Sequence, residues 1–190
     1  MQKFSLLIFS ILLLGPATYA EENAKWVFFD LGKTVLDHGA YNSDISSFED
    51  QRYMTGSREL LQDLLDDGYN IGLIIDIPEE WGNTYETKFT TLKTFVASGW
   101  SDANYPEFEW QLFTHILLPL NNTERKSTNN TILFERALEL ANVTSAIYIG
   151  ENINEMPLAE SVNMKTIHYD GVEGNFPTLE RVKELGNVTP

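Results

Sequence analysis

Four acidic residues stand at positions where their side chains could do chemistry. Asp30, Asp76 and Glu151 each follow a short apolar segment directly, and Glu155 comes four residues after Glu151. Carboxylates that gather at one place repel each other unless they share protons or bind a cation. The pattern therefore predicts either a site for a hard metal ion or raised carboxyl pKa values, although any single one of these acids could instead cap a helix.

The segments around these acids predict a sheet with helices on both faces. Short apolar runs alternate along the chain with stretches of helical periodicity. We expect strands over 25–30, 70–76, 114–120, 146–150 and 165–169, and helices over 57–67, 84–98, 132–141 and 158–162. This alternation is typical of an α/β, Rossmann-like fold with a parallel sheet. Ligands bind such folds at the carboxyl ends of the strands, which is where Asp30, Asp76 and Glu151 fall.

Two connections lack a clear period. Residues 37–55 are polar, and we expect them to form a long loop or flap over the edge of the sheet. Residues 99–113 hold several aromatic side chains. We interpret this segment as an extended connection that its rings pin to the core, in preference to a platform for a ligand.

The first twenty residues have the layout of a secretory signal peptide. Lys3 precedes an apolar run from Phe4 to Leu14, and small residues lead up to Ala20. The run is shorter than the ~20 residues that span a bilayer, which disfavours an uncleaved anchor. We expect cleavage after Ala20, a single domain over 21–190, and an exported protein, periplasmic or secreted, that does not associate with a membrane after cleavage.

The composition limits the partners further. The net charge is −15, and such a chain repels nucleic acid. There is no cysteine, so neither a disulfide nor a thiol nucleophile is available.

The order of several motifs resembles that of the haloacid-dehalogenase (HAD)-like hydrolase superfamily. Asp30-Leu31-Gly32-Lys33-Thr34 after an apolar strand is similar to the superfamily's first motif, Asp-x-Asp-x-Thr. Residues 56–69 resemble the helix before the second motif, and residues 149–155 resemble the fourth, Gly-Asp-x-x-x-Asp. The likeness runs from about residue 25 to 170. It implies a HAD-like fold, and the short interval between the first two motifs leaves room for a minimal cap domain or none.

The resemblance implies roles for particular residues. Asp30 stands at the position of the nucleophile that forms an aspartyl-phosphate, and Thr34 matches the motif's threonine. The resemblance places Mg²⁺ on Asp30, the Gly32 carbonyl, Glu151 and Glu155. Glycine at position 32 replaces the acid that protonates the leaving group, so that function is missing.

The remaining two motifs depart from the pattern. Ile75 and Asp76 stand where a Ser or Thr would bind the phosphoryl group, so the substrate-binding position is occupied by Asp76. The third motif's lysine corresponds best to Lys126, with Arg125 beside it, although Lys126 could equally be a solvated loop residue. His38 could replace the missing acid, or be an ordinary exposed loop histidine.

Two functions follow from these residues. The first is an exported, metal-dependent phosphohydrolase relative with a degenerate site, acting weakly or on an unusual phosphomonoester, so that its partner is a small phosphorylated substrate. The alternative is a non-catalytic exported protein that binds an unknown ligand in the old crevice. Asp30, Thr34 and the two glutamates favour the first, whereas Gly32 and Ile75 favour the second.

Overall fold

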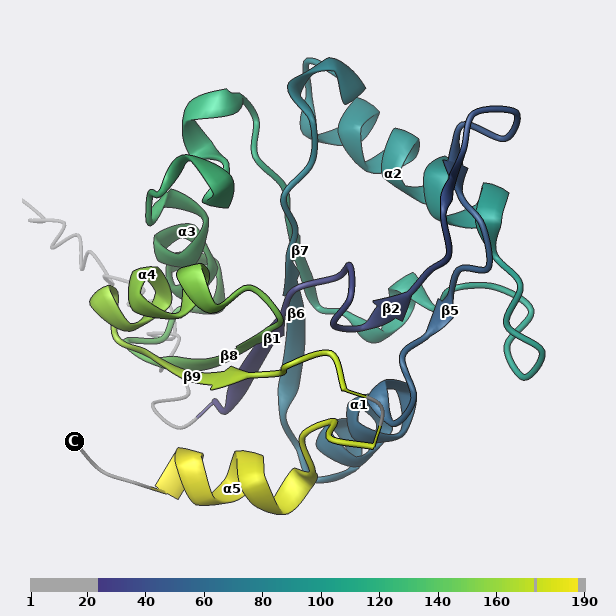
Figure 1. Ribbon diagram of the computed structural model, residues 1–190. Helices are drawn as coiled ribbons and strands as arrows, with labels where there is room; N and C mark the ends of the chain where they lie inside the picture. Colours follow the sequence, from purple (N-terminus) through teal and green to yellow (C-terminus); the bar gives the residue numbers. More distant parts are fainter. Residues whose placement is uncertain (1–23, 173, 188–190) are drawn as a thin grey trace, which may run out of the picture.

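A computed structural model describes residues 24–172 and 174–187, so the predicted signal peptide lies outside the described residues. Its centre is a parallel five-stranded sheet in the order β7-β6-β1-β8-β9 (Figure 1). The strands are β1 (Trp26–Phe29), β6 (Asn70–Ile74), β7 (His115–Leu117), β8 (Ala146–Gly150) and β9 (Met164–His168). The predicted α/β, Rossmann-like architecture is therefore confirmed. No helix within the described residues is long and apolar enough to cross a membrane.

Helices cover both faces of this sheet, as Figure 1 shows. They are α1 (Ser57–Asp66), α2 (Tyr85–Gly99), α3 (Ile132–Ala141), α4 (Met156–Ser161) and α5 (Leu179–Asn187). Helices α1 and α5 contact one face, and α3 and α4 contact the other. Helix α5 was not expected from the sequence, because its short apolar stripe, with Val182 as its buried residue, follows a long irregular segment.

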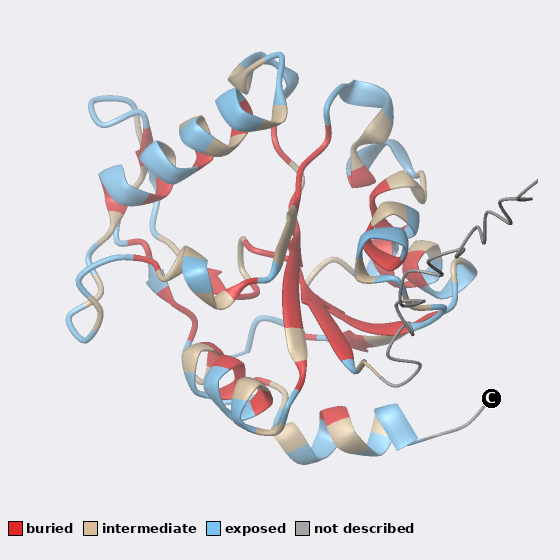
Figure 2. Ribbon diagram, turned by 180° about the vertical axis from the view of Figure 1, so that it is seen from behind, coloured by how far each residue is buried: buried red, intermediate tan, exposed pale blue. Residues whose placement is uncertain are grey.

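The middle strand explains why two separate cores form. All four residues of β1 are buried, and its side chains alternate between the faces. Trp26 and Phe28 pack into the core under α3 and α4, whereas Val27 and Phe29 pack into the core under α1. Figure 2 shows the strands of the central sheet mostly in red, the colour of buried residues. The neighbouring strand must leave room for these rings. A Cβ at Gly72 would lie 2.5 Å from the Phe28 ring, so only glycine fits there.

Residues 37–55, here called the flap, contain more regular structure than expected. Strand β2 (Leu36–Asp37) pairs with β5 (Arg52–Tyr53), and β3 (Tyr41–Asn42) pairs with β4 (Ser47–Phe48), both antiparallel. The pairs are two residues long, too short for a periodic pattern to appear in the sequence. This small β-structure is the cover inserted between the first and second motif regions.

The flap is fastened to the end of α2. Gln51 N donates to Gly99 O at 2.8 Å, and Gln51 Nε2 donates to Phe95 O at 3.0 Å. A Cβ at Gly99 would lie 1.8 Å from Phe48 O, so glycine permits this close approach. The flap and α2 therefore form one wall beside the carboxyl ends of the strands.

The aromatic connection 99–113 packs onto the core. Phe108 and Phe113 are buried, and the Phe108 ring lies 4.5 Å from that of Trp110 and 5.3 Å from that of Tyr53, centroid to centroid. The 3₁₀ turn η2 (Trp110–Leu112) then leads into β7. Strand β7 is shorter than the predicted 114–120 and lies at the sheet edge.

Candidate active site

The sheet brings three of the predicted acids to one edge. Asp30 follows β1, Asp76 comes two residues after β6, and Glu151 follows β8. Because β6, β1 and β8 are adjacent and parallel, their carboxyl ends lie side by side. The backbone joins two of these ends directly, since Asp30 N donates to Ile149 O at 2.9 Å.

Lys126 is buried against the predicted nucleophile. It opens the 3₁₀ turn η4 (Lys126–Thr128), and only 2% of the residue is exposed. Its Nζ lies 2.5 Å from Asp30 Oδ1 and 2.8 Å from Glu155 Oε2. The interpretation of Lys126 as a solvated loop residue is therefore wrong, because a buried ammonium needs the carboxylates that surround it.

Two further residues complete this buried network, and the sequence analysis did not identify them. The Tyr148 hydroxyl in β8 accepts from Lys126 Nζ at 3.0 Å and donates to Glu155 Oε2 at 2.5 Å. Asn152 Nδ2 donates to the other oxygen of Glu155 at 3.3 Å. A signal for Tyr148 was available, since a phenol in an otherwise apolar buried strand needs a hydrogen-bond partner.

Protonation in the network follows from its contacts. Burial alone would lower the pKa of Lys126, but Asp30, Tyr148 and Glu155 together hold it well above the usual value, so the ammonium stays charged. Burial raises the pKa of Tyr148 well above its usual value, so the phenol keeps the proton that it donates to Glu155.

Thr34 joins the first and fourth motif regions. It is fully buried, and its hydroxyl donates to Glu151 Oε2 at 3.1 Å while accepting from Glu151 N at 3.1 Å. His168 Nε2 lies 2.8 Å from the carbonyl oxygen of Glu151. These bonds fix the direction of the Glu151 carboxylate.

Of the four predicted metal ligands, Asp30 and Glu151 have carboxyl groups that interact with each other. Burial and, to a smaller extent, the neighbouring Glu151 carboxylate raise the pKa of Asp30 to about 6, against the opposing effect of Lys126. Two facing carboxylates of this kind suit a shared cation. Glu155 instead binds Lys126 and Tyr148, and within residues 24–172 and 174–187 no three acidic or histidine side chains converge as a metal-binding group.

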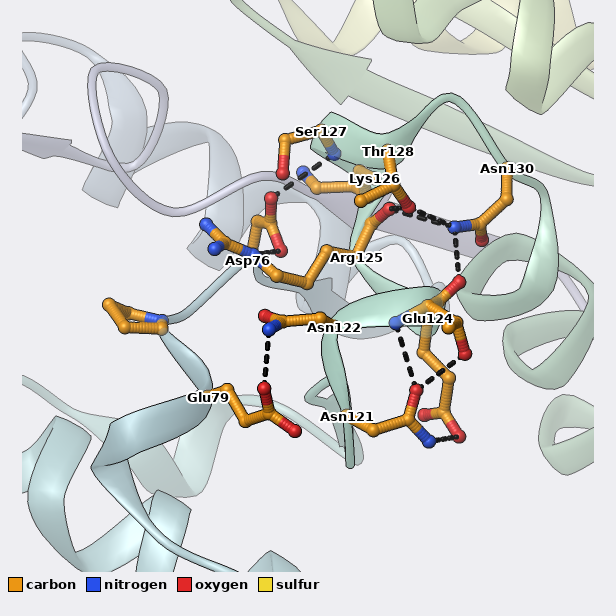
Figure 3. Close-up of polar contacts among 12 residues, drawn as sticks. Asp76, Glu79, Asn121, Asn122, Glu124, Arg125, Lys126, Ser127, Thr128 and Asn130 are labelled. Atoms are coloured by element: carbon orange, nitrogen blue, oxygen red, sulfur yellow. Dashed lines mark hydrogen bonds and ion pairs between the residues drawn. The ribbon is translucent and has the colours of Figure 1, made fainter.

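Asp76 and Ile75 lie at the end of β6, where a phosphoryl ligand was expected. Asp76 Oδ1 accepts from Arg125 Nε at 3.0 Å, and its Oδ2 accepts from Ser127 N at 3.2 Å (Figure 3). The negative charge that the sequence places here is therefore paired. Ile75 is buried in the core and offers no donor.

Gly32 lies beside open space, and His38 packs on the flap. If residue 32 carried a Cβ, no atom of any residue other than its two chain neighbours would lie within 4 Å of it. His38 stacks on Phe48 with centroids 3.9 Å apart, and its Nδ1 lies 3.0 Å from Gly39 O. His38 is thus held on the flap by contacts of its own.

The sequence matches no protein-family model and no curated protein. The fold, however, is similar to those of several solved structures. A HAD family enzyme from Bacteroides thetaiotaomicron, crystallised with magnesium and inorganic phosphate, aligns with a TM-score of 0.52 at 12% identity, over 80% of this chain and 96% of that one. The D,D-heptose 1.7-bisphosphate phosphatase from B. bronchiseptica, also with magnesium and phosphate, aligns with a TM-score of 0.51 at 10% identity, over 87% and 88%.

An uncharacterized protein from Listeria monocytogenes serotype 4b aligns with a TM-score of 0.54 at 14% identity, over 76% of this chain and 77% of that one. Identities this low are informative about architecture and not about activity. The order of the strands, the position of Asp30 after the central one, and these alignments agree: the chain has the fold of the HAD-like hydrolases.

Proposed function

We propose that this protein is an exported, metal-dependent phosphohydrolase relative that uses Asp30 as its nucleophile and lacks an acid for the leaving group. The observation that carries the proposal is the position of Lys126, whose Nζ lies 2.5 Å from Asp30 Oδ1 in a buried site. A lysine held there keeps the Asp30 carboxylate ionised and can neutralise an arriving phosphoryl group.

The reaction would proceed in two displacements. An Asp30 oxygen bonds to phosphorus as the bond from phosphorus to the ester oxygen breaks, and the electron pair leaves on that oxygen. No side chain at position 32 can donate a proton to it. Water then attacks the aspartyl-phosphate at phosphorus, releasing inorganic phosphate and the Asp30 carboxylate, and its proton passes to solvent.

The residues that would hold a metal ion are Asp30, Glu151 and the Gly32 carbonyl. The raised pKa of Asp30 and the hydrogen bonds that orient Glu151 support this assignment. A bound Mg²⁺ would supply charge neutralisation between nucleophile and phosphate. Glu155 acts differently from the prediction, since it holds Lys126 in place through Oε2.

Arg125 is the residue that would replace the missing second-motif hydroxyl. Its Nε is bound to Asp76, and the part of the chain that the structure describes provides no partner for its two terminal nitrogens. Those nitrogens could therefore bind an anion bidentately. The ion pair with Asp76 would hold the guanidinium in position and would not prevent it from binding the anion.

The second candidate function is a binding protein without turnover. Gly32 and the buried Ile75 favour it, because they remove the general acid and the phosphoryl donor.

The deciding experiment measures phosphate release from aryl and acyl phosphates at saturating Mg²⁺. We expect turnover by the wild type, none by Asp30→Asn, and unchanged turnover by Asp67→Asn, whose carboxylate pairs with Lys183 instead. If wild type and Asp30→Asn are equally inert, the binding function is the one that remains.

Export is tested separately. Intact-mass analysis of the protein from its native host is expected to give Glu21 as the first residue. A mature protein that retains Met1 would contradict this part of the proposal.

A further inference from the structure

A cavity of about 750 Å³ opens beside the turn that follows Asp30. It is lined by Leu36, by Ile45 and Phe48 of the flap, and by Phe95 of α2 together with Trp81. Ile75 and Asp76, after β6, line it too. Its size lies in the range of small-molecule sites, about 300–1,000 Å³.

The walls of this cavity are aromatic and carry little charge. Phe48 stacks on His38 at 3.9 Å and meets Phe95 edge to face at 5.5 Å, and Phe95 lies 4.9 Å from Trp81, all between centroids. No lysine or arginine is among the lining residues, and the one carboxylate, Asp76, is paired with Arg125. A second phosphate or a carboxylate would find no cation here, whereas a flat apolar ring would find partners on several sides.

The cavity reaches the loop that follows Asp30, because Gly32 is one of its lining residues. Gly32 lines it and comes two residues after Asp30. The space where a side chain of residue 32 would extend is open. An ester whose phosphoryl group meets Asp30 would direct its organic part past Gly32 toward this space.

We infer that the cavity binds the aromatic leaving group of an aryl phosphate, an inference that rests on the proposed function. The aromatic lining of the cavity and the missing acid at position 32 both favour such a substrate. A phenolate leaves with its electron pair without needing a proton, so the missing acid at position 32 costs such a substrate least. The same absence of a side chain provides the passage for the ring.

Exposed residues at the mouth of the cavity can be substituted without disturbing the core. Tyr41 and Ile45, on the flap hairpin, are 59% and 37% exposed. Ile45→Glu introduces a carboxylate beside the bound ring without disturbing the core. Leu140→Glu is the matched control, because Leu140 is an exposed apolar residue of α3, 55% exposed, and does not line the cavity.

Binding is measured by calorimetric titration of the full mature chain with 1-naphthol, a product that needs no catalysis. We expect Ile45→Glu to weaken binding about tenfold, because an unpaired carboxylate disfavours an apolar neighbour, and Leu140→Glu to leave it unchanged. Thr94→Trp, which adds a large ring at a lining position on α2, should weaken binding as well. Melting curves establish that each variant is folded.

Turnover is then compared for 1-naphthyl phosphate and glycerol phosphate. A kcat/KM that favours the naphthyl ester and falls in Ile45→Glu supports the inference. Naphthol that does not bind, or that binds equally to wild type, Ile45→Glu and Thr94→Trp, overturns it, whatever the turnover. Naphthol binding that Ile45→Glu weakens, without phosphate release from any ester, supports the aromatic site and contradicts the proposed phosphohydrolase.

Discussion

The two sides of the candidate site differ in how far their charged side chains are buried and hydrogen-bonded. On the β1–β8 side, Asp30, Lys126 and Glu155 are buried and linked by hydrogen bonds. On the β6 side, Asp76 and Arg125 form one partly exposed ion pair in place of a hydroxyl ligand. Buried charges must keep all their partners, whereas exposed ones can be exchanged at little cost. The β1–β8 side is therefore where we expect substitutions to be most damaging.

The largest effect is expected from Lys126→Met. Two buried carboxylates then lose their cation, which should destabilise the fold by about 3–5 kcal/mol at neutral pH and abolish turnover. The pKa of Asp30 would rise further, so its protonation should restore part of the stability as the pH falls. Urea unfolding at several pH values measures this. A loss of stability that is the same at pH 5 and pH 8 would contradict the role of Lys126.

Gly32→Asp should increase turnover, whereas Lys126→Met should abolish it. The new carboxyl has room, since nothing lies within 4 Å of its Cβ position. A general acid contributes about 10²–10⁴-fold, so hydrolysis of alkyl phosphates should rise toward that of aryl phosphates. Gly32→Asn, of the same size and without the proton, is the control. Equal rates for the Asp and Asn variants would show that the acid is not what the site lacks.

Asp30 should titrate at unusually high pH in the metal-free protein, with a pKa of about 6. Because burial raises this pKa from 3.8, the folded state gains protons relative to the unfolded one, and its stability should fall as the pH rises from about 4 to about 6. Mg²⁺ favours the ionised carboxylate and should lower the pKa. Carboxyl ¹³C NMR titrations with and without Mg²⁺ follow it directly. A pKa near 4 in both would place Asp30 in water and not in a buried site.

The smallest effect is expected on the β6 side, from Arg125→Gln. If Arg125 binds the phosphoryl group, KM for an aryl phosphate should rise about tenfold, the cost of one charge-assisted contact, with little change in stability. Arg136→Gln is a closely matched control, since Arg136 is 30% exposed and pairs with Glu124, while Arg125 is 31% exposed and pairs with Asp76. Equal KM values for the two variants would show that Arg125 pairs with Asp76 and does not bind the phosphoryl group.

The sequence by itself determined the architecture and the acids at its edge. The apolar runs of β1 and β8 are buried throughout, and that of β6 is buried from Ile71 to Ile74, so the pattern predicted both the sheet and the position of Asp30 and Glu151. It could not predict β2 to β5 or α5, because elements this short or this weakly apolar depend on contacts distant in the sequence.

Only the tertiary structure decided the partners of the charged groups and the shape of the cavity. Lys126 and Asp30 are separated by 96 positions, and Arg125 and Asp76 by 49, so no local pattern connects them. Glu155 was predicted as a metal ligand, yet its orientation follows from Tyr148 and Lys126. Strand order decides which side chains meet at an edge, and the pairing of buried charge then decides where each one points.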